Sequence, residues 1–197
     1  MARGASPRGQ RNRASIAQAA ARLIAEHGLA DWSVAKRKAC RELGLPDNEA
    51  LPGNEEIEEA LRNYNTLFRP HAQAASLREQ RRLALDWMER LAAWKPLLIG
   101  GVAAGWATEH SEVRLELEAE DPKTVELALI NGGIDYQPGD IAPQSATQLI
   151  AGRGARMVRL VIASPMQRRN RPRRDDDARL GVAELKALLE TETFRAG

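Results

Sequence analysis

The sequence predicts an α+β protein in which an N-terminal helical region precedes a small mixed β-sheet domain with flanking helices. Apolar residues recur at helical spacing up to about residue 94, and from Pro96 onward they form short runs or alternate with polar residues. The chain has 197 residues, of which 43% are hydrophobic, and this suits one medium domain or a small domain with an appendage. The expected borders are residues 14–95 for the helical region and 96–190 for the sheet domain.

Four helices are expected in the helical region. Gly28 and Gly44 are typical helix stops, and Asp31 and Asn54 are suitable N-caps. Residues 1–13 carry four arginines without apolar periodicity, so they are expected to be a disordered basic arm. The predicted helices cover residues 16–27, 31–43, 54–68 and 72–94.

The sheet domain is expected to mix strands with two helices. The clearest strand is 112–118, where charged and apolar residues alternate, and a hairpin is expected across Gly152-Arg153-Gly154. Residues 164–174 are expected to form a basic loop, and residues 191–197 a tail. The other predicted strands are 97–99, 134–136, 146–150 and 157–163, and the predicted helices are 121–130 and 182–189.

Composition excludes several classes of protein. No apolar run approaches the roughly 18 to 20 residues that span a bilayer, and the first residues lack the apolar stretch of a secretory signal. The expected location is therefore cytoplasmic, with no membrane partner. A single cysteine, Cys40, excludes an internal disulfide, and the three histidines lack metal-ligand spacing. No G-x-x-x-x-G-K-[ST] loop is present, which disfavours an ATP-dependent ligase or kinase.

Charge is segregated along the chain although the net charge is only +2. Residues 1–41 carry +7 and residues 42–60 carry −7, whereas residues 96–140 carry −7 and residues 141–174 carry +8. The basic segments could meet phosphates, or they could neutralise the acidic segments within the fold or in a second copy of the chain. A homo-oligomer is one of the open alternatives.

A short motif carries a resemblance to a known family. Gly100-Gly101-Val102-Ala103-Ala104-Gly105 is followed, after five residues, by Ser111-Glu112-Val113-Arg114. This pattern resembles the signature of the nucleotidyltransferase superfamily, in particular its minimal versions, which reads G-[GS]-x-A-x-G, five residues, S-D-x-D. The resemblance implies a nucleotidyltransferase-like sheet domain with a nucleotide at the glycines.

The resemblance also implies roles for individual residues. Glycines let the backbone approach a triphosphate, and carboxylates two apart on a strand can hold Mg²⁺. Glu112 would be the catalytic carboxylate and the metal ligand. The residues that would bind the nucleotide or an RNA phosphate are Gly100, Gly101, Gly105, Ser111, Arg114 and Arg159.

Two departures from the signature affect the expected activity. Arg114 occupies the second carboxylate position, and the later strand carries Arg159 where a third carboxylate is usual. Arginine cannot bind Mg²⁺, so transferase activity is expected to be weakened or lost. Arg114 and Arg159 could instead form ion pairs with Glu112 and Glu116, or bind phosphate without a metal.

The alternative is a nucleic-acid-binding regulator or scaffold that uses the N-terminal helices and the basic segments. Residues 16–28, followed by Ser33-Val34, resemble the first two helices of TetR-type repressors, but an acidic segment follows where a basic recognition helix would be needed. RNA contact through Arg153, Arg156, Arg159 and residues 167–174 needs only clustered positive charge.

Overall fold

The structure is a computed structural model, and it describes residues 7–29, 31–46, 50–68, 70–139, 146–170 and 178–196. Its contacts divide the chain into two compact units, Met1–Ser76 with Trp106–Ser111, and Leu77–Gly105 with Glu112–Gly197. We call these the helical unit and the sheet unit. The predicted α+β class, with N-terminal helices before the sheet, is confirmed. The division differs from the expected border at residues 95 and 96, because most of the fourth helix belongs to the sheet unit.

The helical unit contains α1 (Pro7–His27), α2 (Trp32–Glu42), α3 (Asn54–Phe68) and the first residues of α4 (Pro70–Arg90). Its core is made largely of alanine with a few large aliphatic residues. Asp31 caps α2, because its Oδ1 accepts the backbone N–H groups of Ser33 at 2.8 Å and Val34 at 3.2 Å. The largest fully buried side chains of this unit are Ile16, Leu23, Ile57 and Leu61.

Helix α1 begins at Pro7, so the prediction of a disordered arm over residues 1–13 is wrong for residues 7–13; residues 1–6 lie outside the described part. Proline suits the first position of a helix, because its missing N–H would have no partner there. Arg13 also anchors this end. Its Nε lies 2.7 Å from Glu56 Oε2 on α3, and this contact lowers the pKa of Glu56.

The Trp106–Ser111 segment packs within the helical unit. The Trp106 ring lies 5.2 Å from that of Trp32, and its carbonyl accepts the Asn65 Nδ2–H at 3.1 Å. His110 lies against Gly28, where a Cβ would come within 2.8 Å of His110 Cγ. Trp106 and His110 therefore have packing roles in the helical unit.

In the part of the chain that the structure describes, six strands form one sheet in the order β3-β4-β5-β2-β1-β6. Strands β2 and β5 are parallel, and the other neighbours are antiparallel. The expected hairpin of β4 and β5 is confirmed. The strands are β1 (Leu97–Ile99), β2 (Val113–Glu118), β3 (Tyr136–Pro138), β4 (Thr147–Ala151), β5 (Val158–Ala163) and β6 (Arg179–Leu180).

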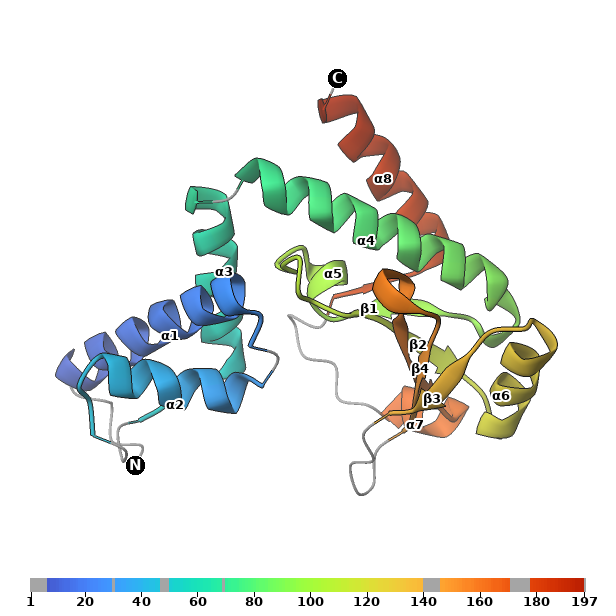
Figure 1. Ribbon diagram of the computed structural model, residues 1–197, viewed down its shortest axis with the longest axis horizontal. Coiled ribbons are helices and arrows are strands. Elements are labelled where there is room, and N and C mark those ends of the chain that lie inside the picture. Colours follow the sequence, from blue (N-terminus) through green and yellow to red (C-terminus); the bar gives the residue numbers. More distant parts are fainter. Residues whose placement is uncertain are drawn as a thin grey trace. The chain divides into compact units, whose positions relative to one another are not determined.

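The two faces of the sheet differ in polarity. Successive strand residues point to opposite faces, so Leu115 and Leu160 share the apolar face, whereas Arg114, Glu116 and Arg159 share the other. Figure 1 shows α4 on one side of the sheet and α7 (Pro165–Asn170) on the opposite side. The apolar face is buried, and the polar face carries the charged residues of interest.

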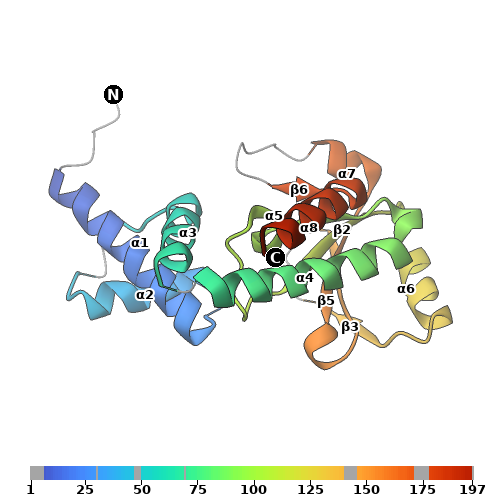
Figure 2. The same ribbon diagram turned by 90° about the horizontal axis from the view of Figure 1, so that it is seen from above.

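Three further helices complete the sheet unit: α5 (Gly101–Ala104), α6 (Pro122–Asn131) and α8 (Val182–Ala196). Helix α8 runs close to α4 (Figures 1 and 2), and Lys186 Nζ of α8 lies 2.7 Å from Glu89 Oε1 of α4. The expected tail at 191–197 is instead helical to Ala196, and α7 replaces part of the expected loop at 164–174. Among the described residues, no helix is both long and apolar enough to cross a bilayer.

Candidate functional site

The exit of strand β1 is built on glycine. Gly100 has φ +75° and ψ −156°, a backbone region that residues with a Cβ essentially never occupy. Its carbonyl accepts the Ala104 N–H at 2.9 Å, and the Gly101 carbonyl accepts the Gly105 N–H at 2.8 Å. The chain can therefore turn directly from β1 into α5 only because Gly100 lacks a side chain.

Arg114 lies beside this turn. A Cβ on Gly100 would lie 3.8 Å from Arg114 Cδ, and Arg114 pairs in register with Ile99 on β1 and with Arg159 on β5. Residues that are opposite in neighbouring strands share a face, so the two arginines stand side by side about 5 Å apart at the backbone. The Arg114 side chain is exposed, and it extends the glycine turn with a cationic surface.

Glu112 and Arg159 form a bidentate ion pair. Arg159 Nε donates to Glu112 Oε2 at 2.7 Å and Nη2 donates to Oε1 at 3.0 Å, while Nη1 donates to Gln148 Oε1 at 3.2 Å. These hydrogen bonds, with the positive charges of Arg159 and Arg114, lower the pKa of Glu112. Pairing of Arg159 with Glu112, one of the alternatives predicted from the sequence, is therefore present.

The residues at this place do not fit Mg²⁺. Both carboxylate oxygens of Glu112 accept hydrogen bonds from Arg159, and the next position on the same face of the strand is Arg114. Within the described ranges there is no group of three or more His, Cys, Asp and Glu residues that could hold a metal ion. Mg²⁺ prefers oxygen ligands in octahedral geometry, and this arrangement offers a cationic neighbour instead.

The other predicted site residues are divided between the two units. Ser111 belongs to the helical unit, where its Oγ accepts the Thr108 N–H at 2.9 Å and closes a turn. Gly105 has φ +85°, and a Cβ there would lie 3.5 Å from Arg81 Nη2. The sheet unit therefore contains Gly100, Gly101 and Gly105 with Glu112, Arg114 and Arg159, whereas Ser111 is part of the other unit.

Arg81 supports the glycine turn and was missed in the sequence analysis. Its side chain is 6% exposed, its Nε donates to the Val102 carbonyl at 3.1 Å, and it pairs with Glu192 on α8. The signal was available in the sequence, because residues 77, 81, 84 and 88 form one helical stripe in which Arg81 is the charged member. A charge on a buried stripe usually has a partner.

A second charged cluster fixes α7 to the polar face of the sheet. Glu116 has no exposed surface, and Arg168 Nε lies 3.2 Å from its Oε1. Arg168 also donates to Glu118 at 3.4 Å and to the Lys95 carbonyl at 2.9 Å. Lys95 Nζ lies 2.6 Å from Glu118 Oε1 and lowers the pKa of Glu118. Arg168 belongs to the run predicted to bind RNA, but its contacts with Glu116, Glu118 and the Lys95 carbonyl give it a structural role.

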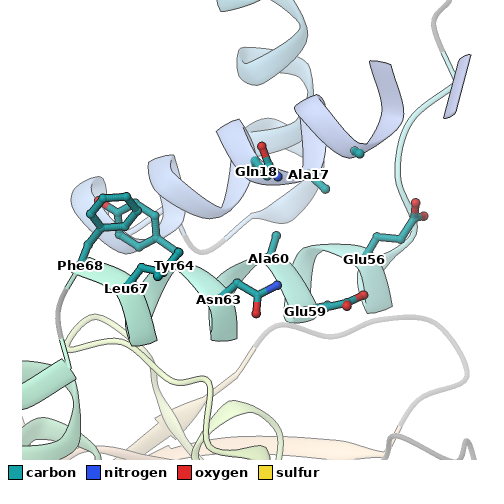
Figure 3. Close-up of a pocket in the computed structure, with 10 residues that line it drawn as sticks. Ala17, Gln18, Glu56, Glu59, Ala60, Asn63, Tyr64, Leu67 and Phe68 are labelled. Carbon is teal, nitrogen blue, oxygen red and sulfur yellow. The ribbon is translucent and has the colours of Figure 1, made fainter. Parts of the chain in front are cut away.

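The helical unit has a groove of about 490 Å³ between α1 and α3. Figure 3 shows Glu56 and Glu59 toward one end of its α3 side and Tyr64, Leu67 and Phe68 toward the other. Leu67 is 73% exposed and Phe68 is 68% exposed, and the Phe68 ring lies 4.9 Å from the Tyr64 ring. Large apolar side chains exposed together on one groove are uncommon on a surface without a ligand or partner.

Comparison of the chain with protein-family models, with curated proteins and with solved structures gives no match. The function must therefore be argued from the residues of this chain.

Proposed function

We propose that the sheet unit is a nucleotidyltransferase-like domain that binds the phosphate of a nucleotide or of RNA without a metal ion, with transferase activity weakened or lost. The observation that carries the proposal is the Gly100 backbone, held in a conformation that only glycine adopts, beside the exposed Arg114. A turn without side chains lets phosphate oxygens approach main-chain N–H groups.

The charges at the turn support phosphate binding more than catalysis. Arg114 can present a planar fork of N–H donors to a phosphate. Arg159 stays in place because Glu112 and Gln148 hold it. The pair of Glu112 with Arg159 leaves no carboxylate to bind Mg²⁺ or to remove a proton from an attacking hydroxyl, so a fast phosphoryl-transfer step has no support among these residues.

The proposal predicts that Arg114→Gln weakens nucleotide binding about tenfold, because a charged hydrogen bond to phosphate contributes about 1.5 to 3 kcal/mol. Titration calorimetry with ATP, GTP, CTP and UTP, with and without Mg²⁺, measures this effect. Gly101→Trp is expected to abolish binding by filling the turn. Arg37→Gln, an exposed arginine of the helical unit, serves as the control and should leave binding unchanged.

Two outcomes would count against the proposal. Wild-type protein that binds none of the four nucleotides would refute the phosphate site. Binding that requires Mg²⁺ would show that Glu112 leaves Arg159 to hold a metal, and it would move the proposal toward an active transferase.

A second candidate function, a protein scaffold, is favoured by the groove between α1 and α3. Its charged lining residues are both acidic: Glu56, which Arg13 already neutralises, and Glu59. Glu56 and Leu67 are eleven steps apart on α3, or about 16 Å at 1.5 Å per residue. These features suit an amphipathic helix of a partner protein with large apolar residues at one end and lysine or arginine at the other.

A labelled 14-residue helical peptide of this pattern tests the groove by fluorescence anisotropy. Phe68→Ser is expected to weaken binding about tenfold, because it removes most of an exposed aromatic anchor. Leu127→Ser on α6 removes a leucine that is 57% exposed elsewhere, and should have no effect. If Phe68→Ser and wild type bind the peptide equally well, the docking site is refuted. If the wild-type chain self-associates and Phe68→Ser does not, the occupant of the groove is a second copy of the chain.

A further inference from the structure

A second cleft lies in the sheet unit, away from the glycine turn. Its volume is about 340 Å³, at the lower end of the range of about 300 to 1,000 Å³ typical of small-molecule sites. The end of α4, residues 133–135 before β3 and the β4–β5 turn line it. Its lining includes Asp86, Trp87, Arg90, Asp135, Arg153 and Arg156.

The β4–β5 turn is pressed closely against Trp87. Gly152 has φ +101°, and a Cβ there would lie 2.6 Å from the Arg156 carbonyl oxygen and 3.2 Å from the Trp87 ring. The Gly152 N–H donates to the Asp135 carbonyl at 2.9 Å. This packing fixes the backbone from which Arg153 and Arg156 project, and both side chains, which are 86% and 71% exposed, line the cleft on its solvent side.

The charges in the cleft are unbalanced. Arg156 Nη2 donates to Asp86 Oδ2 at 3.3 Å, and Arg153 pairs with Asp135. Each guanidinium has five N–H donors, so these pairs leave donors on both arginines. Arg90 is exposed and makes no ion pair with any acid among the residues that the structure describes. The described lining therefore has three arginines and two aspartates, and Arg90 supplies the excess positive charge.

We propose that this cleft binds a phosphate group of a molecule about the size of one nucleotide. Arg90 provides the uncompensated charge, Arg153 and Arg156 provide further donors, and Ile134, with the small exposed part of Trp87, provides an apolar surface for a base. The site shares no residue with the glycine turn, so it stands independently of the function proposed above. Phosphate could come from a free nucleotide or from a nucleotide of an RNA strand, since both present the same anion.

The test compares Arg90→Gln with Arg82→Gln. Both arginines are exposed on α4, but Arg82 does not line the cleft. Calorimetry with AMP and with inorganic phosphate, and anisotropy with a labelled eight-nucleotide single-stranded RNA, measure binding at low salt. Arg90→Gln is expected to weaken binding about tenfold, Arg82→Gln is expected to leave it unchanged, and far-ultraviolet circular dichroism confirms that both variants are folded.

Four results define the outcome. Arg90-dependent binding of AMP supports a free nucleotide, whereas Arg90-dependent binding of RNA alone supports a strand. If Arg114→Gln loses binding while Arg90→Gln binds as well as wild type, the cleft is refuted as the phosphate site and the site at the glycine turn is supported. Equal weakening in Arg82→Gln and Arg90→Gln would reduce the effect to nonspecific charge and overturn the proposal.

Discussion

Replacing Glu116 with glutamine is expected to lower the free energy of unfolding by about 3 to 5 kcal/mol, the usual cost of breaking a buried ion pair by removing one partner. Glu116 has no exposed surface, and its Oε1 lies 3.2 Å from Arg168 Nε and 4.0 Å from Arg179 Nη1. Without the carboxylate charge, two guanidinium groups that are 13% and 19% exposed would face each other across a neutral amide. The cost arises chiefly from those stranded charges.

Urea denaturation followed by circular dichroism measures this loss. Glu89→Gln is the matched control, because it removes an ion pair between Glu89 and Lys186 whose side chains are 50% and 49% exposed. Exposed pairs are screened by solvent, so this variant should unfold at nearly the wild-type urea concentration. Equal stability of Glu116→Gln and Glu89→Gln would show that Arg168 is satisfied by its bonds to Glu118 and to the Lys95 carbonyl alone.

The charge segments of the sequence neutralise one another in part within each unit. In the helical unit, Arg13 pairs with Glu56 and Arg22 with Glu42, which joins the basic first segment to the acidic second one. In the sheet unit, arginines of residues 141–174 pair with acids that precede them: Arg159 with Glu112, and Arg168 with Glu116. Neutralisation within the fold, one of the alternatives left open by the sequence, therefore accounts for part of the segregated charge.

Arginines that are buried in ion pairs within the fold are poor candidates for ligand binding. An arginine such as Arg168, 13% exposed between two glutamates, has little left to offer a phosphate. Exposed arginines beside a cleft or a glycine turn, such as Arg90 and Arg114, are better placed to bind one. The RNA contact predicted from the sequence used Arg153, Arg156, Arg159 and residues 167–174, of which residues 171–174 lie outside the described part.

Sequence pattern predicted the elements that depend on local periodicity and failed where tertiary contacts decide. The alternation at 112–118 and the turn at Gly152 led to β2 and to the β4–β5 hairpin, both confirmed. Helix α7 was missed, because six residues rich in arginine show no apolar stripe, and Arg168 pairs with acids distant in sequence. Arg81 was missed for the same reason, since its partners Val102 and Glu192 are remote along the chain.

The candidate site was predictable in composition but not in geometry. Glycine spacing located the turn at Gly100, and the missing carboxylates at Arg114 and Arg159 were visible in the sequence. The direct pair of Arg159 with Glu112 depends on the parallel register of β2 and β5, which places residue 114 opposite residue 159. Register between strands so far apart in sequence is set by the packing of the apolar face, and a single strand pattern does not determine it.

Gly152→Ala is expected to destabilise the protein by about 3 kcal/mol, through two additive effects. The first is backbone strain, since φ +101° is a conformation that residues with a Cβ rarely adopt. The second is steric, because the new Cβ would lie 2.6 Å from the Arg156 carbonyl oxygen, and a backbone atom cannot rotate away as a flexible side chain can. Relief would require the β4–β5 turn to move off Trp87, which is 5% exposed.

Gly154→Ala separates these two effects within the same turn. Gly154 has φ +56°, and a Cβ there would have no neighbour within 4 Å, so only the conformational cost of about 1 kcal/mol applies. Thermal unfolding followed by circular dichroism, together with urea denaturation, compares the two variants. A difference of about 2 kcal/mol between them would measure the steric contact with Arg156, whereas equal losses would mean that the turn yields to the added methyl group and that the wall of the cleft it forms is not rigid.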